Sequence, residues 1–377
     1  MFRKILIFVI VVLFASNCFF ISAQPDVSAK SAVLIEQKSG KVLFVKDADE
    51  RRPMASTTKI MTALTVLRNE KNLDRKVKIP LQAIKTEGSS MYLQEGEEMT
   101  IRDLLYGMLL VSGNDAANAL AITVGGSMDK FLNEMNEEAA RLKLKNSAFL
   151  NPSGLPDDNH YTTANELAVI TMEAFKYPLF AEIVASVNAR VSYNGIQNAR
   201  LLVNHNRLLK MYEGCDGVKT GFTKEAGRCL VSSATKNGVR LIAVTLNAPN
   251  DWSDHKEMLK FGFAGVKQVT AEKAYEEKIF IPVMGGEQNG VILTNSSDAS
   301  AVSIDGNEKF EKKILMPQFI YAPVKKGQAI GKIIFLSDGY EMGETDLVAT
   351  EDIKVLPPEN FAKRFNRLIE NIVKIIF

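Results

Sequence analysis

The pattern of apolar residues changes near residue 270, and this change limits the folds that the chain can adopt. Before that point, segments with helical spacing alternate with short runs rich in valine, leucine and isoleucine. From about 272 to 356, short β-type runs are divided by turn sequences such as Asn-Ser-Ser and Lys-Lys-Gly. We therefore predict a mixed α/β (α+β) domain over residues 24–270 and a small all-β domain, a spacer or docking module, over residues 271–356.

Local patterns place the main elements of the larger domain. Lys38-Ser39-Gly40 separates two alternating runs between residues 31 and 44 and predicts a hairpin. Apolar residues after Ser56 follow the spacing of a helix with one buried face. A second helix is expected from Thr100, because Thr100-x-x-Asp103 resembles a capping box. The sequences DGVKTGFT, RCLVSSAT and VRLIAVTL, within residues 216–246, predict three successive strands.

Both ends of the chain carry apolar segments. Arg3 and Lys4 precede an apolar run that ends in a small-residue site, so we predict a signal peptide over residues 1–23, with an uncleaved anchor as the alternative. Cys18 follows an asparagine, which is a poor fit to a lipidation site. Residues 357–377 predict an amphipathic helix with cations beside a stripe of bulky apolar residues. Such a helix lies in a membrane interface, or else packs on a domain.

Composition excludes some classes of function. Lysine plus arginine number 46 against 44 acidic residues, so no overall field favours a nucleic acid. The three histidines lie far apart and no His-Glu-x-x-His sequence occurs, so we expect no metal site. Cys215 and Cys229 flank a predicted hairpin and either form a disulfide or remain buried thiols.

Ser56-x-x-Lys59 is the first candidate catalytic motif, a serine nucleophile with a lysine as its base. A serine hydroxyl needs an adjacent base, and a lysine can serve where its surroundings lower its pKa. One helical turn brings the two side chains to the same face. The spacing alone does not decide, because it recurs at Ser127/Lys130, Ser233/Lys236 and Ser253/Lys256.

Two further motifs follow in order. Ser112-Gly113-Asn114 supplies a hydroxyl and an amide at the end of a predicted helix. Lys219-Thr220-Gly221 lies on a predicted strand, where the glycine allows a ligand backbone to approach closely. Each motif is weak alone, but the ordered set of three, each in its expected local structure, is specific.

In these three motifs and their order, the sequence resembles the penicillin-binding proteins that act as serine-type D-Ala-D-Ala carboxypeptidases. The resemblance spans nearly all of residues 24–377 and includes the stretches ASTTKIMTAL, DLLYGMLLVSGNDAANALA, NPSGLPDDNHYTTANELA and GVKTGFTKEAGRCLV. It implies a penicillin-recognising serine transpeptidase/β-lactamase-like catalytic domain. The β-rich region and the terminal amphipathic helix also resemble low-molecular-mass members of this group.

The resemblance also implies a role for each motif residue. Ser56 would be the nucleophile, Lys59 its base, and Ser112 the relay of a proton to the leaving D-Ala. Lys219 would act electrostatically and help hold the terminal carboxylate. Asn114 would bind the peptide amide, and Thr220 and Thr223 would bind the carboxylate. Gly221 would let the substrate backbone approach closely. The backbone N–H groups of Ser56 and Phe222 would form an oxyanion hole. Some relatives carry histidine where this chain has Phe222.

The same resemblance implies that the enzyme would act on peptidoglycan stem peptides, be acylated by β-lactams and need no cofactor. The charge balance predicts no nucleic-acid partner. The predicted signal peptide and terminal helix predict a location on the outer face of the cytoplasmic membrane, with the helix on the membrane surface. A serine β-lactamase is one rival, but a Glu-x-x-Leu-Asn sequence is absent after Ser112. A catalytically silent wall-binding protein is the other, and intact motif residues argue against it.

Overall fold

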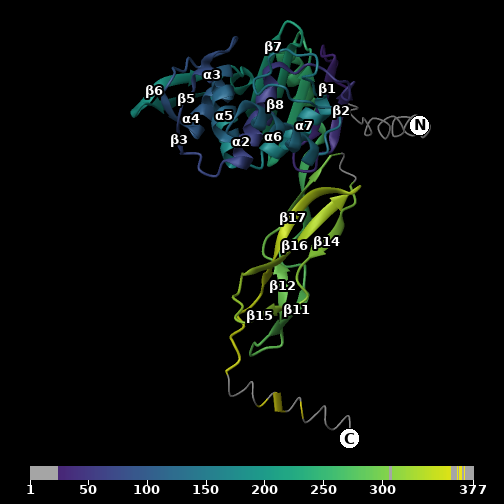
Figure 1. The fold of residues 1–377 in the computed structure, drawn as a ribbon. Coiled ribbons are helices and arrows are strands. Elements are labelled where there is room, and N and C mark those ends of the chain that lie inside the picture. The colour runs from purple at the N-terminus through teal and green to yellow at the C-terminus, as the bar shows by residue number, and fades with distance from the viewer. Residues whose placement is uncertain (1–23, 305–307, 358–362, 364, 367–368, 370–377) are drawn as a thin grey trace, which may run out of the picture.

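The structure is a computed structural model that describes residues 24–304, 308–357, 363, 365–366 and 369. The predicted signal peptide, with Cys18, lies outside these residues, as does most of the predicted terminal helix. Within the described part of the chain, no helix is long and apolar enough to span a membrane. Figure 1 shows a large mixed region, from which an elongated sheet-rich region extends towards the C-terminus.

The larger region is built on a five-stranded antiparallel sheet. Its strands lie in the order β2 (Val42–Lys46), β1 (Ser31–Glu36), β9 (Val239–Leu246), β8 (Gly227–Lys236) and β7 (Cys215–Thr223). The predicted hairpin and the three successive strands are therefore confirmed. β1 pairs with β9, with Val33 opposite Val244, so distant parts of the chain meet in the middle of the sheet.

Helices cover both faces of this sheet. Alternate residues of each strand point to opposite faces. Val33 and Val244 join a core cluster with α7 (Ala164–Ala174), whereas Leu34 and Ala243 join a second cluster with α10 (Asp251–Gly265). The helices are η1 (Ala55–Thr58), α2 (Lys59–Asn69), α3 (Leu81–Ile84), α4 (Ile101–Leu110), α5 (Asn114–Gly125), α6 (Met128–Arg141), α7 (Ala164–Ala174), α8 (Pro178–Ala185), α9 (Leu208–Met211) and α10 (Asp251–Gly265). Two small two-stranded sheets pair β3 (Lys76–Lys78) with β4 (Glu98–Thr100) and β5 (Asn188–Tyr193) with β6 (Ile196–Val203).

Two helices fix the positions of the first two motifs. α2 is buried along its length from Lys59 to Leu67, so it forms the centre of the helical layer. α4 begins where predicted, because the Thr100 hydroxyl accepts a hydrogen bond from the backbone N–H of Asp103 at 3.0 Å. The chain then turns at Ser112 and continues directly into α5.

The sheet-rich region is all-β, as predicted. Its strands are β10 (Lys267–Glu272), β11 (Ile279–Met284), β12 (Gly290–Asn295), β13 (Ala299–Ser303), β14 (Glu311–Leu315), β15 (Ile320–Tyr321), β16 (Ala329–Ser337) and β17 (Tyr340–Ala349). The order along the sheet is β10-β13-β17-β12-β11-β15, with β16 pairing with both β14 and β17. Ile281, Leu293 and Phe335 are fully buried in its core. The domain limits at residues 270 and 356 remain predictions.

The two cysteines of the described chain are free thiols. In the β7–β8 ladder, Cys215 lies opposite Ala234 and Cys229 lies opposite Gly221. Six residues of strand therefore separate the two positions, about 20 Å at the usual rise of a strand. A disulfide requires Cα atoms within about 7 Å, so this pairing does not form here.

Candidate active site

Ser56 and Lys59 meet at the start of the buried helix. Ser56 lies in η1, directly after Ala55, whose φ of 49° makes a sharp turn into the helix. Lys59 opens α2 one turn later, and its Nζ donates a hydrogen bond to the Ser56 Oγ at 3.0 Å. Two other serines with this spacing have structural partners. Ser127 caps α6 by accepting the N–H of Lys130 at 3.2 Å, and the Ser233 hydroxyl donates to Asp216 at 2.6 Å.

The Lys59 ammonium is enclosed by acceptors. Besides Ser56, its Nζ donates to the Asn114 Oδ1 at 2.7 Å and to the backbone carbonyl of Ser153. Burial and, next, the charge of Lys219 hold the pKa of Lys59 well below its usual range, while Asp115 acts in the opposite direction. A lysine that readily loses its proton beside a serine hydroxyl can serve as a general base.

Ser112 and Asn114 come from the joint between α4 and α5. Ser112 has a φ of 61° and is only 4% exposed, yet its side chain lines a cleft that also contains Ser56. The Asn114 side chain lies beneath the cleft, where its Nδ2 donates to the carbonyl of Glu87 at 2.6 Å. This bond aims the Oδ1 at Lys59.

Lys219 is the second buried cation. It lies on β7 and its Nζ donates to the carbonyl of Thr220 at 2.7 Å. Burial lowers the pKa of Lys219 to about 7, so both charge states are accessible near neutral pH.

Gly221 allows β7 to lie against the nucleophile. A Cβ at this position would be 3.1 Å from the backbone nitrogens of both Ser56 and Thr57, which is tighter than an ordinary contact. The following residue, Phe222, is 65% exposed at the mouth of the cleft. The Thr223 hydroxyl points elsewhere in this state, because it accepts the N–H of Ala226 at 3.0 Å.

The cleft has a volume of about 560 Å³. It brings together Ser56, Ser112, Thr220, Gly221 and Phe222 of the predicted site, whereas Lys59, Asn114 and Lys219 are buried behind it. Sequence reasoning missed two arginines and a histidine in its lining. Arg207 and Arg228 are cationic, and Arg228 forms an ion pair with Asp251 at 3.0 Å. Burial and the charge of Lys219 lower the pKa of His205, which favours its neutral ring.

Sequence reasoning also missed the support beneath the nucleophile. Gly154, with a φ of 87°, packs so closely that a Cβ would lie 1.9 Å from the carbonyl oxygen of Ala55. Its neighbour Ser153 supplies the carbonyl that binds Lys59. The sequence NPSGLPDDNH carries these residues, but no periodic pattern indicates what such a loop contacts.

His160 belongs to the same support. Its Nδ1 accepts the N–H of Leu150 at 3.0 Å, so its Nε2 carries the proton and donates to the Thr58 Oγ1 at 2.8 Å. Thr58 in turn donates to the carbonyl of Ala55 at 2.8 Å. Burial lowers the pKa of His160 to about 4, so the ring is neutral at neutral pH. These bonds fix the turn that presents Ser56.

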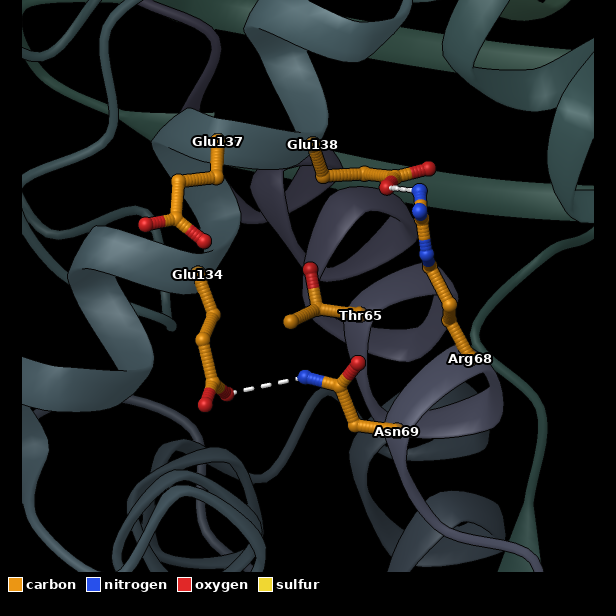
Figure 2. A pocket seen from close by; sticks show the side chains of 6 residues that line it. All are labelled: Thr65, Arg68, Asn69, Glu134, Glu137 and Glu138. Atoms are coloured by element: carbon orange, nitrogen blue, oxygen red, sulfur yellow. Dashed lines mark hydrogen bonds and ion pairs between the residues drawn. The ribbon is translucent and has the colours of Figure 1, made fainter.

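A second cavity, of about 160 Å³, lies between α2 and α6. Figure 2 shows glutamate side chains facing polar residues of α2, with Arg68 bonded to Glu138 and Asn69 bonded to Glu134 at 2.9 Å. Ser56 and Lys59 do not line this cavity. Across the residues that the structure describes, no group of three acidic, histidine or cysteine side chains could hold a metal ion.

Comparison with known families decides what this arrangement of motifs represents. Residues 19–250 match the family model for D-alanyl-D-alanine carboxypeptidase. The chain belongs to this family. Residues 270–355 match a second model, the C-terminal domain of penicillin-binding protein 5.

Individual relatives agree over most of the chain. A D-alanyl-D-alanine carboxypeptidase of Bacillus subtilis, DacF, is 37% identical over 345 residues, which cover 89% of this chain and 88% of that protein. DacA of Escherichia coli is 32% identical over 374 residues, covering 94% and 89%.

Solved structures extend this agreement to the fold. Penicillin-binding protein 5 from Haemophilus influenzae is 30% identical, with a TM-score of 0.64 over 88% of this chain and 99% of that one. The Streptomyces K15 DD-transpeptidase is 34% identical, with a TM-score of 0.62 over 64% of this chain and 99% of that one. The predicted penicillin-recognising fold with a separate β-rich region is confirmed.

Proposed function

We propose that the protein is a serine-type D-Ala-D-Ala carboxypeptidase that removes the terminal D-Ala from peptidoglycan stem pentapeptides. The observation that carries this proposal is the contact between the Lys59 Nζ and the Ser56 Oγ at the floor of an open cleft. Membership of the D-alanyl-D-alanine carboxypeptidase family supports the choice of substrate.

Acylation begins at Ser56. Its Oγ attacks the carbonyl carbon of the penultimate D-Ala while neutral Lys59 takes the hydroxyl proton. The negative charge that develops on the carbonyl oxygen is bound by the backbone N–H groups of Ser56 and Phe222, and each such donor typically contributes about 2.7–4 kcal/mol. The C–N bond then breaks, and Ser112 passes a proton to the departing amine of D-Ala. Water hydrolyses the ester and restores the free serine.

The remaining motif residues hold the substrate. Lys219 and Thr220, with Thr223, would bind the terminal carboxylate, and Gly221 would let the substrate backbone lie along β7. Asn114 would bind the peptide amide. In the free protein its side chain is bonded to Lys59 and Glu87, so one of these bonds would be exchanged on binding. No cofactor takes part in these steps.

β-Lactams would enter the same reaction as substrate analogues. Attack by Ser56 opens the lactam ring and leaves a penicilloyl ester on the serine. The ester persists when water cannot reach it productively, so the proposed enzyme is inhibited rather than acting as a β-lactamase.

Intact-mass spectrometry tests this proposal. The mature chain is incubated with benzylpenicillin and, separately, with a peptide that ends in D-Ala-D-Ala. We expect a stable penicilloyl adduct and release of one D-Ala, both lost in the Ser56→Ala variant. Ser127→Ala is the matched control, because it changes a serine with the same spacing that only caps a helix. Rapid penicillin turnover with an untouched peptide would indicate a β-lactamase, and neither adduct nor release would indicate a silent wall-binding protein.

The setting proposed for this activity is the outer face of the cytoplasmic membrane, in the periplasm or cell-wall space. The signal peptide predicted over residues 1–23 supports export. The apolar stripe and flanking cations of residues 357–377 support attachment to the membrane surface. Among the described residues of that segment, the side chains of Phe365 and Ile369 are 53% and 44% exposed.

A further inference from the structure

An exposed apolar face lies on the outer strands of the second sheet. β15 runs parallel to β11, with Ile320 beside Val283 and Tyr321 beside Met284. Val283 is buried, so the alternating pattern of a strand turns Met284 and Tyr321 outward together. Tyr321 is 71% exposed and Met284 is 52% exposed.

Phe319 extends this face. Its ring packs edge-on against Tyr321, with centroids 5.6 Å apart, and it is 46% exposed. We call Met284, Phe319 and Tyr321 the sheet-end surface. Large apolar groups that gather at one exposed place indicate a contact with a partner or a membrane.

The chain leaves the sheet beside this surface. The backbone N–H of Leu356 donates to the carbonyl of Gly285 at 2.8 Å, directly after Met284. Gly286 pairs with Val355 in an isolated bridge. Only Pro357 and Pro358 stand between this anchored point and the rest of residues 357–377. Two residues span at most about 7 Å, so the terminal segment begins close to the sheet end.

We infer that the sheet-end surface of β11 and β15 contacts the lipid bilayer and forms a second membrane attachment beside the terminal segment. The inference rests on the membrane association proposed above. Tyrosine and phenylalanine suit the boundary between headgroups and acyl chains, because their apolar rings are buried while the tyrosine hydroxyl stays hydrated.

Apolar contact rather than charge drives this attachment. Three exposed lysines of the sheet region, Lys325, Lys326 and Lys354, are accompanied by the acidic residues Asp352 and Glu287. The Asp352 carboxylate accepts the N–H of Lys326 at 2.7 Å, and the N–H of Glu287 donates to the carbonyl of Lys354 at 2.9 Å. Because opposite charges lie together here, binding through the sheet-end surface depends little on salt.

Figure 1 shows the geometry that results. β11 and β15 lie at the far end of the sheet-rich region, and the larger region lies at the opposite end. A bilayer at the sheet end would therefore hold the catalytic cleft away from the membrane, on the side where the cell wall is found.

Binding to lipid vesicles tests the inference with the full mature chain. The probe is vesicles of phosphatidylcholine with phosphatidylglycerol, and the double variant Phe319→Ser/Tyr321→Ser is compared with Phe280→Ser. Phe280 lies on the same face of β11 and is 57% exposed, but at the opposite end of the strand. Since attachment scales with buried apolar area, we expect the double variant to lower the partition coefficient about fivefold or more. Phe280→Ser should leave it nearly unchanged, and penicilloylation should be equal in all three proteins, which shows that they are folded.

The possible results of the vesicle experiment distinguish the sheet-end contact from the proposed membrane attachment and from the proposed carboxypeptidase activity. Equal partitioning of the double variant and the wild type would overturn the sheet-end contact while leaving membrane attachment intact. No binding by the wild type would overturn both, without bearing on D-Ala release. A dimer that forms without lipid and is lost in the double variant would instead assign this surface to a second copy of the chain.

A fluorescent reporter gives an independent measurement. Tyr321→Trp and Phe280→Trp are each made in a Trp252→Phe background, because Trp252 is the sole tryptophan of the chain. Vesicles with brominated acyl chains should quench the tryptophan at position 321 and not the one at position 280. Unquenched emission at position 321 would contradict the inference even if the partition coefficients supported it.

Discussion

The two regions of the molecule differ in whether they bury lysine side chains. The larger region buries two lysines, Lys59 and Lys219, at 0% and 1% exposure. In the second region, every described lysine reaches the surface. Burying a cation costs stability, so a fold retains it where the lowered pKa serves chemistry. The difference fits a reactive first region and agrees with the attachment role proposed for the second.

The largest expected effect comes from removing the base. Lys59→Met keeps the length of the side chain but cannot accept a proton, so acylation by benzylpenicillin should slow by about 10²–10⁴-fold. Lys312→Met in the second region, where Lys312 pairs with Glu272 and with Glu277, is the control and should acylate normally. Stopped-flow or quenched mass spectrometry measures both rates. Acylation of Lys59→Met within threefold of wild type would assign the base to another group.

The other buried lysine should make stability depend on pH. The folded pKa of Lys219 is about 7 and its ordinary value is 10.5, so the unfolded chain binds more protons between these limits. Folding stability should therefore rise as pH increases from 7 towards 10. In Lys219→Met this contribution disappears, so the variant's advantage in melting temperature should be largest near pH 7 and shrink with rising pH. A constant difference across this range would show that Lys219 is not shifted.

A smaller effect is expected where backbone approaches the nucleophile. Gly154→Ala places a methyl group against the Ala55 carbonyl and should cost about 1–3 kcal/mol while slowing acylation. Gly327→Ala is the matched control in the second region, with a φ of 81° and nothing within 4 Å of the added Cβ. Both variants lose stability because alanine is strained in the left-handed backbone conformation. The difference between their losses of unfolding free energy therefore measures the overlap of the added methyl group with the Ala55 carbonyl. Chemical denaturation measures it, and equal losses would show that the Ala55 turn moves freely.

The smallest effect concerns the bond between His160 and Thr58. Thr58→Val and His160→Gln should each slow acylation, and the double variant should lose less than their sum by about 1 kcal/mol, since both act through one hydrogen bond. The rate constants of the four proteins give this coupling directly. Purely additive losses would mean that His160 supports Ser56 through some other contact.

Local signals were sufficient to find the three motifs and to predict the elements that carry them. The Thr100 cap, the spacing after Ser56 and the strand that carries Lys219 each depend on near neighbours in the chain. The His160–Thr58 bond and the Ser153 carbonyl on Lys59 join residues 102 and 94 positions apart, so no short-range pattern indicates them. The arginines of the cleft were missed for the same reason, because exposed cations in loops carry no periodic signal.

The packing around Ser56 has a consequence for drug resistance. Gly154 from one side and Gly221 from the other lie so close to the backbone at residues 55 and 56 that neither position accommodates a side chain without moving the nucleophile. Substitutions there would sacrifice turnover of the natural peptide together with reaction at the antibiotic. Variants that discriminate between the two are therefore expected at the open mouth of the cleft, at Phe222, Arg207 and Arg228, where side chains can change while the serine stays in place.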